Sequence, residues 1–383
     1  MRTTLLPLAL SWAVPLGAQP GGPLPIGFAD TLLFNDSLHY NAFGYDGPAP
    51  LFVQAWFPLE GTLAEPVGRL DPEHLRFQDL RKPTLPVALQ PVHRELLLRM
   101  DSAFIEYCLR YPFDGDEPID YAPFSEQQVK DSLLALGTQA FRAALPLTAS
   151  LPVIVYHHGS QGLCDENVWM AEHFAEHGYI FLSCNFHWPL HGAMYGTPLV
   201  WEPDRGSIRT MLRFARRLAN GNKVFYIGHS WGAQEGWCTL YEPGLADAFI
   251  SLETTMEWKT DSVEVRDKWP QVLEAITTQR YPMPVLMVAD TEGEPPFPMF
   301  RGVQGDVRYL DPKEPFGHES YTSAYLMRLA GEGRFALPDR EAMQRQFDVH
   351  AALLDELLAF LQQRAGRTSP APVHSSGDPF LRY

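Results

Sequence analysis

The sequence has few basic residues, and this scarcity excludes several kinds of partner. Its 383 residues include 30 Lys and Arg against 46 Asp and Glu, which gives a net charge of −16 at pH 7. Nucleic acids and anionic lipid headgroups are bound by basic surfaces, so neither is expected as a partner. No long block of like charge is present, and the acidic residues are therefore expected to lie on a solvated surface.

Cysteine is also scarce. The chain has four cysteines, at positions 108, 164, 184 and 238. Their spacing matches no zinc-binding motif. They could form disulfides in an oxidising compartment or remain buried thiols, and the sequence leaves both alternatives open.

Long hydrophobic runs are lacking too. No stretch reaches the ~20 apolar residues that a membrane-spanning helix requires. The longest apolar segment near the start, residues 5–16, follows Arg2 and precedes small residues that end at Ala18. This order is typical of a secretory signal peptide. The sequence therefore predicts a signal peptide over residues 1–18, cleavage after Ala18, and a secreted or periplasmic protein without stable membrane insertion.

Strand-like and helix-like segments alternate from residue 151 to residue 363. The strand-like segments are short apolar runs of the kind found in strands that are buried on both faces. Predicted strands cover residues 151–159, 179–186, 223–229, 247–253, 283–290 and 306–311. Predicted helices cover residues 167–178, 207–221, 231–242, part of 261–280, 319–331 and 339–363. This alternation indicates an α/β fold, with a mostly parallel central sheet and helices on both faces.

The first 150 residues are less regular. Residues 50–58 alternate apolar and polar side chains, as an early antiparallel strand would. Two helices, over 91–110 and 125–144, predict a helical insertion around residues 91–145. The chain is thus expected to form one domain over residues 19–365, followed by a loose polar tail over 366–383.

Residues 228–232 read Gly-His-Ser-Trp-Gly, which matches the pattern G-x-S-x-G. Ser230 stands where a predicted strand ends and a predicted helix begins. A serine on such a tight turn has its hydroxyl lifted out of the sheet, and the glycines relieve the crowding. The N–H of Trp231, at the helix start, would favour an anion. Ser230 is therefore the candidate nucleophile.

A serine nucleophile needs a general base, which is most often a histidine oriented by a carboxylate. In this architecture the chain order is serine, acid, histidine. Only three histidines follow Ser230: His350 lies within a predicted long helix, His374 lies in the tail, and His318 lies in a loop after a strand. A loop after a strand is the expected place for the base, so His318 is the candidate.

Two carboxylates could orient His318. Glu253 ends the strand that follows the nucleophile helix, and Asp290 ends the next one. Asp290 follows the strand that most often supplies the acid, but the usual position, two or three residues further on, holds Gly293. We favour Glu253 and keep Asp290 as the alternative.

The tetrahedral intermediate of acyl transfer needs a second backbone donor besides Trp231. Residues 156–162, Tyr-His-His-Gly-Ser-Gln-Gly, end the first strand of the parallel series in a glycine-bearing loop. Ser160 or Gln161 would supply the N–H, and we favour Ser160.

Four segments together resemble a known family: "VIVYHHGSQG", "HGYIFLSCNFHW", "IGHSWGA" and "FISLETTMEW". They are similar to the platelet-activating factor acetylhydrolase and dienelactone-hydrolase-like branch of the α/β-hydrolases. The resemblance covers roughly residues 150–320. It implies an α/β-hydrolase fold with Ser230 as nucleophile, His318 as base and the backbones of Ser160 and Trp231 as oxyanion donors. It also places the acid at Glu253, where the family has aspartate.

Metal binding is the weaker interpretation of the remaining histidines. His157 and His158 are adjacent, so they project to opposite sides of a strand end. His187 and His191 are separated by Pro189, which breaks the helix that their spacing would need. We therefore expect no metal and no cofactor.

Of the tryptophans, Trp188 and Trp231 directly follow strand ends and are the better candidates for lining an apolar acyl pocket.

These residues predict a serine hydrolase that cleaves a carboxylic ester through an acyl-enzyme, as an esterase or acetylhydrolase does. The expected partner is a small-molecule ester, lipid-like esters included. An amidase or peptidase would use the same triad, and a catalytically inactive binding protein would keep the same pocket. These two alternatives stay open.

Overall fold

The computed structural model describes residues 24–59, 74–111, 117–146, 150–187, 202–260, 262–290, 297–312, 316–331, 335, 339–366 and 380–382. The predicted signal peptide and most of the predicted tail lie outside these residues. Within them, no helix combines the length and the apolar character needed to cross a bilayer.

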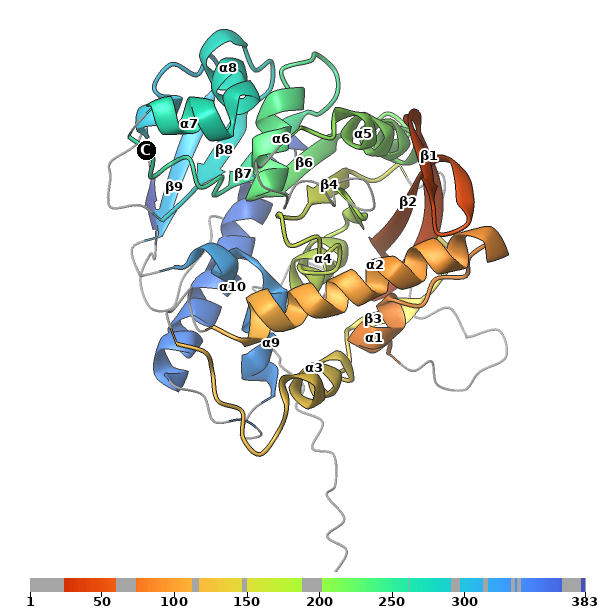
Figure 1. The fold of residues 1–383 in the computed structure, drawn as a ribbon. Coiled ribbons are helices and arrows are strands. Elements are labelled where there is room, and N and C mark those ends of the chain that lie inside the picture. Colours follow the sequence, from red (N-terminus) through yellow and green to blue (C-terminus); the bar gives the residue numbers. More distant parts are fainter. Residues whose placement is uncertain are drawn as a thin grey trace, which may run out of the picture.

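One sheet runs through the described part of the chain, with the strand order β10-β9-β8-β7-β6-β4-β5-β2-β1-β3 (Figure 1). Its strands are β1 Ile26–Ala42, β2 Tyr45–Pro58, β3 Ala140–Arg142, β4 Val153–His157, β5 Ile180–Ser183, β6 Val224–His229, β7 Ala248–Leu252, β8 Val285–Val288, β9 Val307–Pro312 and β10 Phe380–Arg382. The run from β5 to β9 is parallel. Strand β2 pairs antiparallel with both β1 and β5, and β10 pairs antiparallel with β9. The predicted mostly parallel central sheet is confirmed.

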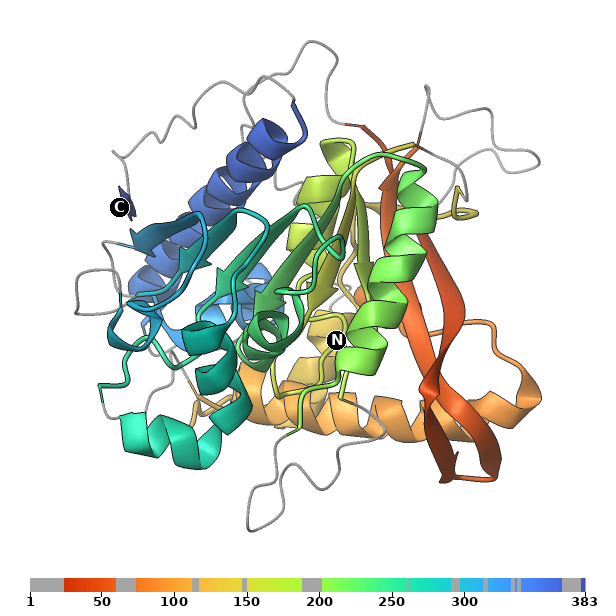
Figure 2. The ribbon, with the colours of Figure 1, turned by 90° about the horizontal axis from the view of Figure 1, so that it is seen from above.

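Helices cover both faces of this sheet (Figures 1 and 2). They are α1 Phe77–Leu80, α2 Gln90–Ala103, α3 Glu126–Leu134, α4 Val168–Glu176, α5 Arg205–Ala219, α6 Trp231–Thr239, α7 Ser262–Lys268, α8 Pro270–Thr278, α9 Ser323–Ala330 and α10 Arg340–Arg364. A π-helical turn, Phe104–Leu109, continues α2, and a 3-10 turn, η5 His318–Tyr321, precedes α9. One apolar core joins the sheet to α2, α3, α4, α9 and α10, and a second core joins it to α5, α6, α7 and α8.

Strand β6 shows why the parallel strands are continuous apolar runs. Phe225 and Ile227 belong to the first core, whereas Val224 and Tyr226 belong to the second. Successive side chains of a strand point to opposite faces. A strand that helices cover on both sides therefore needs an apolar residue at every position, and this is the pattern that made these strands recognisable in the sequence.

The order of the central strands creates a crevice. The chain leaves β4, passes through α4 on one face to β5, and then returns through α5 on the other face to β6, on the opposite side of β4. At such a switch point the connections after two neighbouring strands diverge, and ligands bind in the crevice at the carboxyl ends of those strands. Here the loop after β4 and the turn after β6 meet.

The structure differs from the sequence predictions mainly at the two ends of the sheet. Strand β1 was not predicted, and the helix predicted over 125–144 ends at Leu134 and is followed by the short strand β3. The tail was expected to be loose, but its described residues Phe380–Arg382 pair with β9. Edge strands are defined by their pairing partners more than by their own composition, so the sequence marks them weakly.

All four cysteines are buried free thiols. Of the two alternatives that the sequence left open, the structure has thiols and no disulfide.

Candidate active site

Ser230 occupies the tight turn between β6 and α6. Its backbone has φ 54° and ψ −120°, a region that a residue with a side chain seldom adopts. Its N–H donates to the carbonyl of Leu252 in the neighbouring strand β7 (3.0 Å). A strained backbone conformation persists only where the surrounding structure imposes it, and such residues cluster at functional sites. The strain therefore supports a functional role for this turn.

The glycines on either side of Ser230 are required by close contacts. A Cβ at Gly228 would lie 2.5 Å from the carbonyl oxygen of Gly232 and 2.6 Å from the nitrogen of Ala233. A Cβ at Gly232 would lie 2.2 Å from the carbonyl oxygen of His157. Because these neighbours are backbone atoms, a side chain at either position would force the strand and the helix apart.

We therefore expect Gly228→Ala to displace the turn that carries Ser230. Overpacking of this kind costs about 1–3 kcal/mol, and a misplaced nucleophile lowers activity by about 10²-fold. Urea unfolding and steady-state kinetics measure the two effects. Gly302→Ala is the matched control, because a Cβ there meets nothing within 4 Å. Equal behaviour of the two variants would contradict the close packing of this turn.

The structure brings His318 and Glu253 to Ser230. The Nε2 of His318 lies 3.0 Å from the Ser230 Oγ, and its Nδ1 lies 2.6 Å from the Oε1 of Glu253. His318 begins η5 after β9, and Glu253 directly follows β7. Since a carboxylate only accepts hydrogen bonds, Nδ1 carries the proton of a neutral ring, and Nε2 is left to accept from the serine hydroxyl.

Asp290, the alternative acid, has other hydrogen-bond partners. Its Oδ2 accepts a hydrogen bond from the N–H of Phe316 (2.7 Å), and its carbonyl accepts one from the indole of Trp258 (2.9 Å). Asp290 thus fastens the loop that leads into His318. Geometry selects Glu253 as the carboxylate in contact with the imidazole.

Glu253 is fully buried, and its environment disfavours charge. Burial raises the pKa of its carboxyl to about 8, although His229 and the Tyr321 hydroxyl act in the opposite direction. A carboxyl that keeps its proton cannot stabilise a neighbouring imidazolium. The His318–Glu253 pair must therefore lose a proton before it can serve as an oriented base, because two coupled groups titrate as a pair.

This shift predicts an alkaline pH optimum. We expect kcat/KM to rise with pH with a midpoint near pH 8 and to level off above about pH 9, whereas a free imidazole would give a midpoint of about 6.5. A pH–rate profile from pH 5 to 10 measures it, with residual activity at pH 8 checked after each incubation to exclude unfolding. A midpoint at about pH 6.5 would contradict a raised carboxyl pKa.

The loop after β4 lies directly against the nucleophile. A Cβ at Gly159 would lie 3.1 Å from the Ser230 Cβ. The N–H of Gly159 donates to Glu166 (3.4 Å), and Gly159 and Gly162 close a turn (3.3 Å) with Ser160 and Gln161 at its centre. On the other side of Ser230, Trp231 is the first residue of α6. The structure thus brings both segments of the expected oxyanion hole to Ser230, and the choice of Ser160 as donor stays a prediction.

Three further side chains, those of His229, Gln161 and Glu319, hold the site together; of these residues only Gln161 was named from the sequence, as an alternative backbone donor. His229 donates from Nε2 to the carbonyl of His318 (3.0 Å), and its Nδ1 lies 3.5 Å from Glu166. Gln161 donates to Glu319, the residue after the base. Each lies next to a predicted site residue in the sequence, and that adjacency is the signal that could have identified them.

The remaining sequence candidates fall in different places. His350 is buried in α10, where its Nδ1 lies 3.0 Å from the carbonyl oxygen of Ser320. Burial lowers the pKa of its imidazole to about 4. His374, Trp188 and His191 lie outside the described residues. Trp231 is half-buried, and the side chain of Trp258 is 45% exposed, with its ring centroid 6.1 Å from that of His318. Trp258 is thus the aromatic residue that flanks the base.

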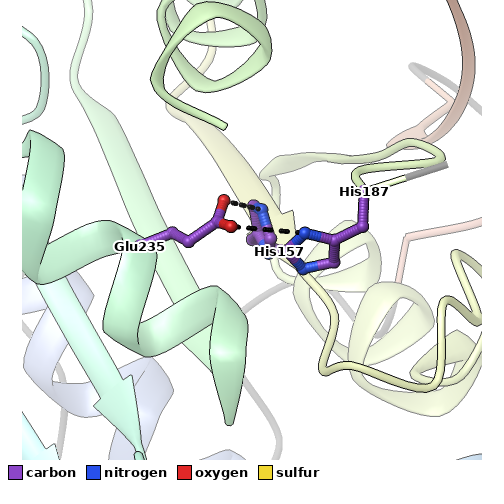
Figure 3. A group of neighbouring side chains, drawn as sticks. All are labelled: His157, His187 and Glu235. Carbon is purple, nitrogen blue, oxygen red and sulfur yellow. Dashed lines mark ion pairs between the residues drawn. The ribbon is translucent and has the colours of Figure 1, made fainter. Parts of the chain in front are cut away.

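A second cluster of polar side chains lies at the start of the loop after β4, residues 158–162, which we call the oxyanion loop. In the sequence His157 is next to His158 and His187 is close to His191, but the structure brings His157 and His187 together around Glu235 of α6 (Figure 3). Although burial alone would raise it, the two imidazoles hold the pKa of the Glu235 carboxyl well below its usual range. Their ligand atoms are close enough together to hold a metal ion.

Comparison with known proteins identifies the fold. No protein-family model and no curated protein sequence matches the chain. A ferulic acid esterase from Streptomyces cinnamoneus is similar in structure, with a TM-score of 0.54 and 16% identity over 95% of this chain and 98% of that one. Two further structures are less similar. A dienelactone hydrolase from Anabaena variabilis has a TM-score of 0.31 and 18% identity over 48% of this chain and 84% of that one. An acylaminoacyl peptidase from Pyrococcus horikoshii has a TM-score of 0.35 and 14% identity over 60% of this chain and 40% of that one.

The sheet topology and the first of these similarities show that the chain has the α/β-hydrolase fold. The prediction of this fold is confirmed.

Proposed function

We propose that this protein is a serine hydrolase that cleaves carboxylic esters. The observation that carries the proposal is the chain of contacts from the Ser230 hydroxyl through both nitrogens of His318 to Glu253. The strained backbone of Ser230 supports it, because strain of this kind presents a hydroxyl at the top of the sheet. The finer family placement, in the acetylhydrolase and dienelactone-hydrolase-like branch, is part of this proposal.

In the proposed reaction His318 accepts the Ser230 proton as the serine oxygen attacks the ester carbonyl. The oxyanion that forms is held by the N–H groups of Trp231 and Ser160. His318 then donates its proton to the leaving alcohol, and an acyl group remains on Ser230. Water then gives a proton to His318 and attacks the acyl carbon; the bond to the Ser230 oxygen breaks, His318 returns the proton to that oxygen, and the acid is released. Throughout, Glu253 keeps the imidazole oriented and stabilises its charged form.

The aromatic side chains beside the base support a substrate with a flat apolar group. Trp258 exposes 45% of its surface next to His318, and Trp231 is half-buried at the nucleophile. Aromatic faces at such a site stack on rings and pack against acyl chains. A structurally similar protein is a ferulic acid esterase, so hydroxycinnamate esters belong among the substrates to be tested.

The proposal is tested with p-nitrophenyl esters of increasing acyl length, a methyl hydroxycinnamate and a p-nitroanilide matched to the best ester. We expect a higher kcat/KM for the esters than for the anilide. Faster cleavage of the anilide would favour an amidase or peptidase. Failure of folded protein to hydrolyse any ester or anilide would favour a binding protein and overturn the proposal.

A further inference from the structure

The cluster at the start of the oxyanion loop joins three elements that are distant in the sequence. His157 is the last residue of β4, His187 lies just beyond β5, and Glu235 lies in the second turn of α6. The Nε2 of His157 is 3.2 Å from the Oε2 of Glu235, and the Nδ1 of His187 is 3.3 Å from its Oε1 (Figure 3). All three side chains are at least nine-tenths buried.

The proton of His157 is placed by its other ring nitrogen. Its Nδ1 lies 3.0 Å from the carbonyl oxygen of His158. A carbonyl can only accept, so Nδ1 must carry the proton of the neutral ring, and Nε2 then holds a lone pair. That lone pair faces the Oε2 of Glu235, which is also only an acceptor while it is ionised. Two acceptors 3.2 Å apart in a buried site repel each other unless a positive species lies between them.

The hydrogen-bonding capacity of Glu235 is not used by its neighbours. Among the described residues, neither carboxylate oxygen of Glu235 has a hydrogen bond of proper geometry, and neither does the Nε2 of His157. One ligand atom from each of the three residues lies within 4.8 Å of the others. Each imidazole is 3.2 or 3.3 Å from its nearest Glu235 oxygen, close to the edge of about 3.3 Å of a tetrahedron around a zinc ion at about 2.0–2.1 Å from its ligands. Two imidazoles and one carboxylate are a set of ligands that zinc accepts.

The contact between His157 and the His158 carbonyl is itself typical of a metal ligand. A histidine that binds a metal through one nitrogen almost always donates its other N–H to a carbonyl or carboxylate. A second proton on His157, donated to Glu235, is the other way to remove the repulsion, but the contact between Nε2 and Oε2 does not have the geometry of a hydrogen bond.

We propose that His157, His187 and Glu235 bind a divalent transition-metal ion, with Zn²⁺ as the preferred species. The site holds the oxyanion loop to the nucleophile helix. His157 directly precedes residues 158–160, and Glu235 lies one helical turn beyond Trp231, whose ring centroid is 6.0 Å from that of His187. Close approach of β4 to α6 is possible because residue 232 is glycine: a Cβ there would lie 2.4 Å from the Nδ1 of His157.

Metal content tests the proposal without reference to activity. The full chain is purified with added zinc, dialysed to remove loose ions and measured by mass spectrometry of the metals. We expect about one equivalent of zinc per chain. Glu235→Gln and His187→Ala should each lose most of it. The matched control is His177→Gln, which removes a histidine from the partly exposed group formed by His173, Glu176 and His177 and should leave the zinc content unchanged.

A second measurement uses the unaltered protein, in case a variant does not fold. Protein stripped with a chelator should regain zinc and melt several degrees higher when Zn²⁺ is added, because a ligand that binds only the native state stabilises it. Cobalt(II) in place of zinc should give the visible bands of a four-coordinate site. Absence of zinc uptake by the stripped wild-type protein would overturn the proposal, as would a content that falls in His177→Gln and persists in Glu235→Gln. Because no readout is enzymatic, failure here leaves the proposed esterase function untouched, and the reverse also holds.

Discussion

Ser230→Ala is expected to reduce kcat/KM on the best ester by about 10⁴–10⁶-fold, because alanine leaves His318 with no nucleophile to activate. The residual rate should stay above that of water, since the oxyanion donors and the binding site remain. Fold and stability should change little: Ser230 is buried, but its strained backbone is held by the contact between its N–H and Leu252. Circular dichroism and urea unfolding check this point.

A fluorophosphonate probe provides the complementary measurement. It reacts with an activated serine and not with an ordinary hydroxyl, so the wild-type protein should be labelled at Ser230 and Ser230→Ala should not be labelled at all. Ser262→Ala, at an exposed position in α7, is the control and should keep both labelling and turnover. Labelling of Ser230→Ala to the wild-type extent would mean that another residue is the nucleophile.

The parallel half of the fold was predictable because one physical condition acts at every residue. Strands β4 to β9 must be apolar on both faces, and the helices between them have a regular amphipathic period. The position of Ser230 followed from where such a strand ends, and His318 followed from the order of the triad along the chain. For Ser230 and His318 the local sequence pattern and the fold topology indicate the same positions, so both residues can be identified from the sequence alone.

Other features depend on distances that no local pattern encodes. Strand β1 carries polar residues such as the half-buried Asp30 and the buried Asn35, and its pairing with β2 makes it a strand. The metal-ligand group was missed for a related reason. His157 ends β4 and His187 follows β5, the neighbouring parallel strand. Because the carboxyl ends of parallel strands meet at the same edge of a sheet, the sequence could have paired these two histidines. Glu235, in contrast, approaches them only through the packing of α6 against the end of β4, which the glycine at position 232 permits.

The choice between Glu253 and Asp290 gives the sharpest test of the site, because the sequence left both acids open. Glu253→Gln keeps the shape of the side chain but can no longer hold the imidazole in the required tautomer. A loss of this kind lowers kcat by about 10⁴-fold. Asp290→Asn removes charge from a side chain that accepts a hydrogen bond from the N–H of Phe316. The amide oxygen can still accept that bond, so we expect activity within about tenfold of wild type.

The Glu253→Gln substitution should lower activity but raise the stability of the fold at alkaline pH. The pKa of Glu253 is raised to about 8 in the folded protein, so the native state binds more protons than the unfolded chain between the ordinary carboxyl pKa of about 4.3 and pH 8. The contribution of Glu253 to stability is therefore present at low pH and is lost as the pH rises through that window. Glu253→Gln removes this loss. Its melting temperature relative to wild type should thus be higher at pH 9 than at pH 6, whereas Asp290→Asn should show a smaller change.

An inactive Asp290→Asn beside an active Glu253→Gln would contradict the geometry. An inactive Glu253→Gln with no relative gain in stability at pH 9 would show that the carboxylate is already ionised at neutral pH, and would place the acid limb of the pH–rate profile on the imidazole.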